Sequence, residues 1–184
     1  RPEISPSTGC RRDSDEARGT EAQYPPKNYE YYKSLPPERY EDELREWYKS
    51  ETGQILNLEN PQTYNEKMQW MKLHDSTPLK TRLADKYLVR DWVKQQIGEE
   101  YLVPLLGVWD NFNDIDFNQL PDRFVLKVNH GAGWTVIVKN KKTFDKNRAR
   151  AKMSEWLNTN YAFHFGFELH YKDIVPKIIA EQYL

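Results

Sequence analysis

Residues 124–140, FVLKVNHGAGWTVIVKN, place a glycine-rich turn between two short apolar runs. Gly131 and Gly133 carry no Cβ, so backbone N–H groups in this turn can approach a ligand closely. Clustered backbone N–H groups form a concavity that binds anions, and phosphate is the usual occupant. The turn therefore predicts contact with an anion, which a hairpin that only reverses direction would not need.

Two lysines extend this interpretation. Lys127 alternates with Leu126 and Val128, so we expect its side chain to face away from them and into a cleft. Lys139 holds the corresponding position on the return strand. Two ammonium groups and a glycine turn suit a triphosphate. The spacing alone supports an ordinary hairpin with solvated lysines equally well, because Gly-x-Gly between strands is neither a P-loop nor a dinucleotide-binding fingerprint.

The elements that must position this turn begin with a helical region. Apolar residues at helical spacing predict a helix over residues 37–51. Thr63 and Glu66 form the Thr-x-x-Glu pattern of a capping box, which predicts that a second helix starts there. A third helix is predicted over residues 78–97, with Gly98 as its C-terminal cap. Its expected buried positions include Leu79, Leu83, Tyr87 and Trp92.

The second half of the chain has strand signals. The expected elements are an extended segment at residues 101–109, strands at 124–129 and 134–140, a helix within 143–161 capped by Thr143, and a strand at 175–180. Helices followed by strands with one intervening helix predict an α+β fold, or an α/β one, with a helical front end.

Composition excludes several function classes. The chain has 27 Lys plus Arg against 28 Asp plus Glu, which argues against a nucleic-acid binder because such proteins carry a basic excess. Mean hydropathy is −0.92, and no apolar run approaches the roughly 18 residues of a transmembrane helix. We therefore predict neither a nucleic-acid partner nor a transmembrane segment.

Cysteine and histidine usage predicts no metal site. Cys10 is the single cysteine, which excludes an internal disulfide framework and a cysteine-based zinc site. His74, His164 and His170 have no metal-like mutual spacing and are expected to be structural or exposed. The low cysteine count fits a reducing compartment. We expect a cytoplasmic protein, with peripheral membrane contact and a secretory origin as open alternatives.

Five segments together resemble the TupA-like branch of the ATP-grasp superfamily, from about Pro37 to Leu184. They are NLENPQTYNEKMQWMKLHD, PLKTRLADKYLVRDWV, IGEEYLVPLLGVWD, FVLKVNHGAGWTVIVKN and PKIIAEQYL. The resemblance implies a helical N-terminal region at residues 37–100. It also implies the first, nucleotide-lid part of an ATP-grasp domain at residues 101–184, built on antiparallel strands. Residues 1–36 are expected to be a disordered tail or linker, because residues 1–23 hold almost no large apolar side chain.

The resemblance also implies ATP-contacting residues. A strand-end lysine would contact the phosphates, the glycine turn would close over the triphosphate, and the backbone of a Glu-x-aromatic-Leu hinge would read the adenine edge. Lys86 or Arg90 would reach a phosphate; a helix-surface ion pair between Asp85 and Arg82 is an equally supported alternative. The expected ATP-binding residues are Lys86, Lys127, His130, Gly131, Ala132, Gly133, Trp134, Lys139, Glu181, Gln182, Tyr183 and Leu184.

The activity that the resemblance implies is ATP-dependent carboxylate–amine ligation through an acyl-phosphate, in the modification of cell-surface polysaccharides or peptide polymers. ATP and Mg²⁺ would be used, with an acidic sugar or polymer as acceptor and an amino acid or amine as the second substrate. Glycosyltransferases are the expected functional neighbours. A glycan kinase on the same fold and a non-catalytic nucleotide-lobe scaffold are the alternatives.

The chain stops at the expected hinge, where ATP-grasp enzymes continue with the ligands for magnesium. We therefore expect it to be part of a longer protein, with the metal ligands beyond Leu184. The sequence identifies no catalytic residue. On this expectation, residues 1–184 alone would bind ATP weakly and would be inactive.

Overall fold

The computed structural model describes residues 27–164 and 166–184, which form helices around a four-stranded antiparallel sheet. This is the α+β fold expected from the sequence. The helices are α1 (Tyr29–Ser34), α2 (Tyr40–Thr52), α3 (Tyr64–His74), α4 (Pro78–Ala84), α5 (Val89–Gln96) and α6 (Lys146–Leu157). The strands are β1 (Leu105–Trp109), β2 (Phe124–Val128), β3 (Thr135–Val138) and β4 (Ile178–Gln182).

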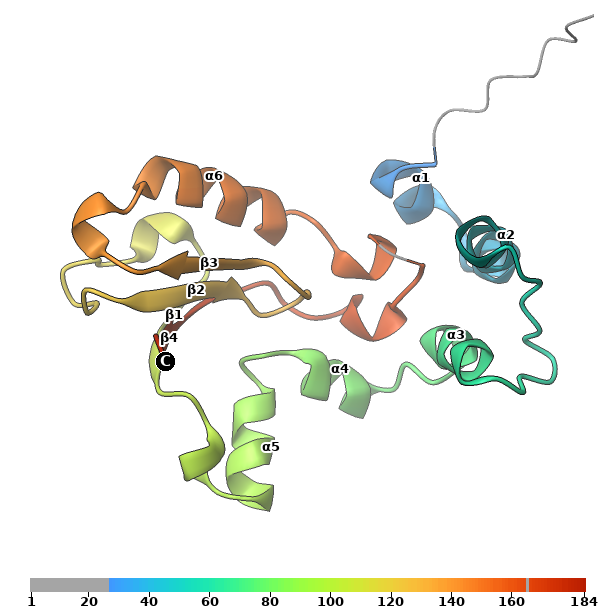
Figure 1. Cartoon of the computed structure of the whole chain (residues 1–184), viewed down its shortest axis with the longest axis horizontal. Coiled ribbons are helices and arrows are strands. Elements are labelled where there is room, and N and C mark those ends of the chain that lie inside the picture. The colour runs from blue at the N-terminus through green and yellow to red at the C-terminus, as the bar shows by residue number, and fades with distance from the viewer. Residues whose placement is uncertain (1–26, 165) are drawn as a thin grey trace, which may run out of the picture.

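The sheet lies between α6 on one face and the α4–α5 region on the other (Figure 1). Its strand order is β1-β4-β2-β3, so the last strand of the described chain pairs with both β1 and β2. Phe124, Leu126 and Val128 are fully buried on the α6 face, where they pack with Met153. The residues between them, among them Lys127, therefore face the α4–α5 side, as the alternation predicted.

A second hydrophobic cluster joins the N-terminal helices to the loop before β4. Leu44 and Tyr48 of α2 pack there against Phe163 and Phe167. The backbone N–H of Asn160 donates to the Tyr29 hydroxyl at 2.8 Å, which ties α1 to the same loop. The helical front end is thus fastened to the chain that leads into β4.

Two expectations about the front end need correction. Helix α1 and its packing lie within the segment expected to be a tail, so ordered structure starts before residue 37. The remainder of the expected tail, residues 1–26, lies outside the described residues. The helix predicted over residues 78–97 is two helices, because Asp85 ends α4 and its carboxylate accepts the N–H groups of Tyr87 and Leu88 at 2.8 and 3.2 Å.

Other local predictions had mixed outcomes. The capping box is confirmed, since the Thr63 hydroxyl accepts from the Glu66 N–H and the Glu66 carboxylate accepts from the Thr63 N–H. The cap of α6 is Asp145 and not Thr143, which ends a preceding 3₁₀ turn. Burial of Leu79 and Trp92 was predicted wrongly: they are 56% and 38% exposed.

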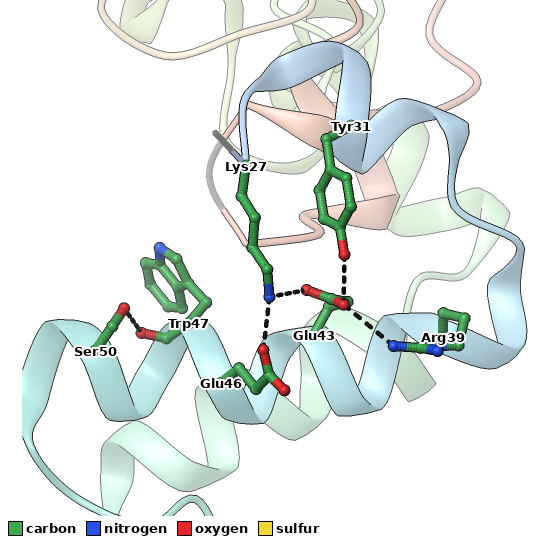
Figure 2. Close-up of polar contacts among 7 residues, drawn as sticks. All are labelled: Lys27, Tyr31, Arg39, Glu43, Glu46, Trp47 and Ser50. Atoms are coloured by element: carbon green, nitrogen blue, oxygen red, sulfur yellow. Dashed lines mark hydrogen bonds and ion pairs between the residues drawn. The ribbon is translucent and has the colours of Figure 1, made fainter. Parts of the chain in front are cut away.

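A buried carboxylate fastens α1 to α2 (Figure 2). Glu43 is only 3% exposed, and it accepts from Lys27 at 2.7 Å, from the Tyr31 hydroxyl at 2.6 Å and from Arg39 at 3.3 Å. Burial alone would raise the pKa of the Glu43 carboxyl, but the hydrogen bonds from Lys27 and Tyr31 outweigh it and hold that pKa below its ordinary value. Lys27 also pairs with the exposed Glu46.

Replacing the buried carboxylate should therefore destabilise the fold. We expect Glu43→Gln to lower the unfolding free energy at neutral pH by about 2 kcal/mol, because it replaces the buried anionic acceptor of Lys27, Tyr31 and Arg39 with a neutral amide. The matched control Glu46→Gln, which removes an exposed partner of the same lysine, should cost at most about 1 kcal/mol. Urea unfolding of both variants measures the difference, and equal losses would contradict the assigned burial.

The pH dependence has a definite sign. Because the folded pKa of Glu43 lies below its value of 4.5 in the unfolded chain, its stabilisation is present above that pH. The stabilisation is lost as pH falls through the folded pKa. The gap between the wild-type protein and Glu43→Gln should therefore narrow in acid, and a gap that widened there would be inconsistent with this network.

Candidate functional site

The centre of the candidate site is an ion pair on the sheet face opposite α6. Lys127 of β2 pairs with the carboxylate of Glu181 on β4, and their side chains are 29% and 10% exposed. The register explains the encounter: Val125 lies opposite Glu181, and Lys127 lies opposite Ile179, so the two charged residues are diagonal neighbours on one face. The pair is thus fixed by strand register.

A second cation reaches the same carboxylate from α5. Arg90 places Nη1 3.2 Å from the other Glu181 oxygen, and its Nη2 donates to the Val103 carbonyl at 2.7 Å. The Arg90 side chain is 14% exposed. One carboxylate therefore orients two cations that come from a strand and a helix.

Lys86 brings a third cation to this face. Its ammonium donates to the Gly131 carbonyl, and its backbone N–H donates to the Asn129 carbonyl at 3.1 Å. Burial lowers the pKa of Lys86, and the nearby positive charge of Lys127 lowers it further. This face thus carries three cations, Lys86, Arg90 and Lys127, and two carboxylates, Glu181 and, at longer range, Asp85. The difference leaves an excess of positive charge beside the glycine turn (residues 130–134).

The two glycines of the turn have different reasons to be glycine. A Cβ on Gly131 would lie 2.6 Å from the Trp134 ring and 2.8 Å from the Tyr161 ring, so packing requires its absence. Gly133 has φ of +74° and open space around it, so backbone conformation is its constraint. Ala132 and Gly133 are exposed. The tip of the turn is therefore open to a ligand, while its base is closely packed.

His130 and Asn129 hold the base of the turn. The His130 imidazole is buried and places Nε2 3.0 and 3.3 Å from the carbonyl oxygens of Trp156 and Thr159. Burial lowers the pKa of His130. In this arrangement the ring supports the turn against the end of α6; its contact with a phosphate stays a prediction.

Asn129 is a residue that sequence reasoning missed. It is fully buried; its amide oxygen accepts from the Lys177 N–H at 2.7 Å and its amide nitrogen donates to the Val175 carbonyl at 2.9 Å. The turn is thereby clamped to the chain entering β4. An asparagine directly between a strand and a glycine turn was the available signal.

The remaining expected residues lie around this cluster. Lys139 follows β3 and is exposed, and no hydrogen bond or ion pair joins it to another described residue, so the structure does not bring it to Glu181. Trp134 stacks on Trp156 with ring centroids 6.1 Å apart. At the expected hinge, the Gln182 N–H donates to the Pro104 carbonyl at 3.0 Å.

Tyr183 and Leu184 follow β4 and end the chain described here. The guanidinium of Arg123 lies over the Tyr183 ring, 4.1 Å from its centroid, and Leu184 is 84% exposed. Because Arg123 precedes β2 and Tyr183 follows β4, this contact continues the pairing of the two strands beyond Phe124 and Gln182. The expected hinge (residues 181–184) thus begins within β4 and continues beyond the sheet, where Tyr183 lies beside the Arg123 guanidinium.

A comparison with models of protein families shows to which family this chain belongs. The model of the TupA-like ATPgrasp family matches residues 66–184, which include α4, α5, the whole sheet and the glycine turn. The chain belongs to the TupA-like ATP-grasp family. No curated protein and no solved structure gives a significant match. Membership implies ATP binding and, in general, the use of Mg²⁺.

The family's two ligands fit the described residues unequally. The cation excess beside an open turn tip fits a triphosphate. Across residues 27–164 and 166–184, no three His, Cys, Asp or Glu side chains come together as a group that could hold a metal ion. Nucleotide-bound Mg²⁺ commonly takes one or two protein carboxylates besides phosphate oxygens, so the position of its ligands stays a prediction. Within the same residues, no helix is long and apolar enough to cross a membrane.

The two glycines offer a paired test of the turn. We expect Gly131→Ala to destabilise the protein by about 2–3 kcal/mol, because the new methyl group overpacks against two rings. Gly133→Ala should cost about 1 kcal/mol, because only a left-handed backbone opposes it. Urea unfolding of the two variants side by side checks the order, and a larger loss at Gly133 would show that the base of the turn is not closely packed.

Proposed function

We propose that the triphosphate of ATP binds over the Lys127–Glu181 pair, beneath the glycine turn. The observation that carries this proposal is the positive excess of Lys86, Arg90 and Lys127 on one sheet face of a nearly neutral chain. Gly133 at the exposed tip of the turn would add a backbone N–H donor without adding charge. Anionic oxygens are the groups that such an arrangement stabilises.

In this proposal each side chain has a defined task. Lys127 and Lys86 bind phosphate oxygens as point charges, and Arg90 holds its planar guanidinium in place through its bonds to Glu181 and Val103. Glu181 keeps the cations oriented before a nucleotide arrives, which reduces the reorganisation needed during the reaction. The adenine would lie against the backbone at the end of β4. Mg²⁺, when bound, supplies further neutralisation of phosphate charge.

The reaction that we propose is ATP-dependent carboxylate–amine ligation. A carboxylate oxygen attacks the γ-phosphorus, the bond to the bridging oxygen of ADP breaks, and an acyl-phosphate forms. An amine then attacks the acyl carbon and expels inorganic phosphate, giving an amide. The cations of this site would contribute by positioning and by offsetting phosphate charge.

The substrate class rests on family analogy. We propose an acidic sugar or polymer acceptor and an amino acid or amine, in cell-surface polysaccharide or peptide-polymer modification, in the cytoplasm beside glycosyltransferases. The support is the family match, and no contact of the described residues selects one acceptor. A glycan kinase would use the same phosphate-binding groups, and a scaffold would keep the fold without turnover.

The first test is nucleotide binding. In the full reading frame that contains these residues, Lys127→Met should weaken Mg-ATP binding by about 10- to 100-fold, the value of one charge-assisted hydrogen bond. The control Lys152→Met removes an exposed lysine from α6, on the other face of the sheet, and should change the affinity less than twofold, within experimental error for a distant surface charge. Isothermal titration calorimetry measures both, and equal affinities would reject the proposed phosphate site.

Product analysis tests the reaction. Incubation with Mg-ATP, acidic glycan and an amino acid should give ADP, inorganic phosphate and an amide, detected by mass spectrometry. A phosphorylated glycan with no free phosphate would identify a kinase, and ATP binding without any ADP would identify a scaffold. Either of these two results would overturn the ligase proposal while leaving the phosphate site intact.

A further inference from the structure

A cavity lies among α3, α4 and the 3₁₀ turn Leu169–Tyr171, on elements that supply none of the three cations described above. Its volume is about 300 Å³. Four of its lining residues are apolar and four are polar or ionisable. The lining residues are Met68, Met71, Leu83 and Ala84, and Lys72, Asp75, Lys80 and His170.

Lys72 is the unusual member of this lining. It is partly buried, and within residues 27–164 and 166–184 no side chain or backbone group forms a hydrogen bond or ion pair with its ammonium. Its ammonium lies over the Trp47 ring, 5.2 Å from the ring centroid, and Trp47 is not one of the residues that line the cavity. Burial lowers the pKa of Lys72, which the longer-range attraction of Glu168 partly offsets. A desolvated cation without a hydrogen-bonding partner is a costly arrangement that an anion would relieve.

The other charges of the cavity leave about one positive charge for a ligand. Lys80 is already paired with Asp75. Burial lowers the pKa of His170, and the charges of Lys80 and Lys72 lower it further, so this ring is neutral near pH 7. Lys72 therefore remains as the cation that no direct ion pair balances. A monoanion matches this charge, whereas a phosphate dianion would exceed it and would meet the carboxylate of Asp75.

One face of α3 carries both this charge and apolar side chains. Met71 and Lys72 follow Met68 by three and four positions, so both lie on the same face of the helix as Met68. Leu83 and Ala84 of α4 complete the apolar part. Met side chains are flexible and adapt to ligands of irregular shape. This face belongs to the segment NPQTYNEKMQWMKLHD, to which the nucleotide site assigns no chemical task.

We propose that this cavity is a binding site for a small monocarboxylate with an aliphatic body. The carboxylate accepts hydrogen bonds from the Lys72 ammonium, with His170 as a second donor, and the aliphatic body lies on Met68 and Met71. The proposal does not depend on ATP binding, because none of its residues belongs to the Lys127–Glu181 cluster.

The methionines provide the experiment. The sequence has three, and the third, Met153, is fully buried against the other face of the sheet, where it serves as an internal control. In protein labelled with ¹³C at the methionine methyl groups, hexanoate should shift the Met68 and Met71 signals saturably and leave Met153 unchanged. Hexanol has the same aliphatic body without the charge, and it should bind at least about tenfold more weakly. Single Met→Leu substitutions assign the signals.

Three variants separate charge from shape. Lys72→Met should weaken hexanoate binding at least about tenfold, while the control Lys67→Met, which changes an exposed lysine of the same helix outside the cavity, should not. Ala84→Leu should weaken binding by filling the cavity with all charges retained. Lys72→Met should also unfold at the same or a higher temperature than the wild-type protein, because it removes a desolvated charge.

Three results would overturn the proposal. They are the absence of saturable shifts at Met68 and Met71, equal binding of hexanol and hexanoate, and unchanged binding in a folded Lys72→Met variant. If Lys72→Met fails to fold, unchanged hexanoate binding in Ala84→Leu would overturn it instead. Loss of ATP binding in the Lys127→Met variant bears on none of these outcomes.

Discussion

A single carboxylate, that of Glu181, holds the cationic face of the sheet together. Its two oxygens pair with Lys127 from β2 and Arg90 from α5, and its side chain is only 10% exposed. Desolvating such charges costs several kcal/mol per ion, so the arrangement is tolerable only with favourable geometry and additional hydrogen bonds. That geometry requires β4 beside β2 and α5 against the same face. The pairing of Glu181 with Lys127 and Arg90 therefore constrains both the strand order and the placement of α5.

The glycine turn beside this face is held by anchors of its own. Lys86 follows α4 and donates to the carbonyls of Asn129 and Gly131, one through its backbone and one through its ammonium. The other side of the turn is held by His130 against the end of α6 and by Asn129 against the chain entering β4. The base of the turn is thus fixed from three directions. The tip residues Ala132 and Gly133 are exposed, and the proposal places phosphate there.

Sequence reasoning succeeded where one local interaction determines the structure. The capping box at Thr63 is a contact over three residues, and the outward direction of Lys127 follows from strand alternation. It failed where similar local signals compete. The apolar spacing of residues 78–97 continues through Asp85, and only the side chain's bonds to following N–H groups show the break. Thr143 and Asp145 are both good caps, but Thr143 lies in the preceding 3₁₀ turn, and the Asp145 carboxylate accepts the Arg148 N–H at 2.9 Å.

The site was less predictable than the fold, because a lysine's partner is a tertiary property. Lys127 and Lys72 are alike in sequence, and each could be a solvated surface cation. Lys127 pairs with a carboxylate 54 positions later, and Arg90 reaches that same carboxylate over 91 positions, which no local pattern reveals. Lys72 has no such partner among the described residues. The first lysine is therefore preorganised by the fold, whereas the second keeps a desolvated charge that only a ligand's anion would balance directly.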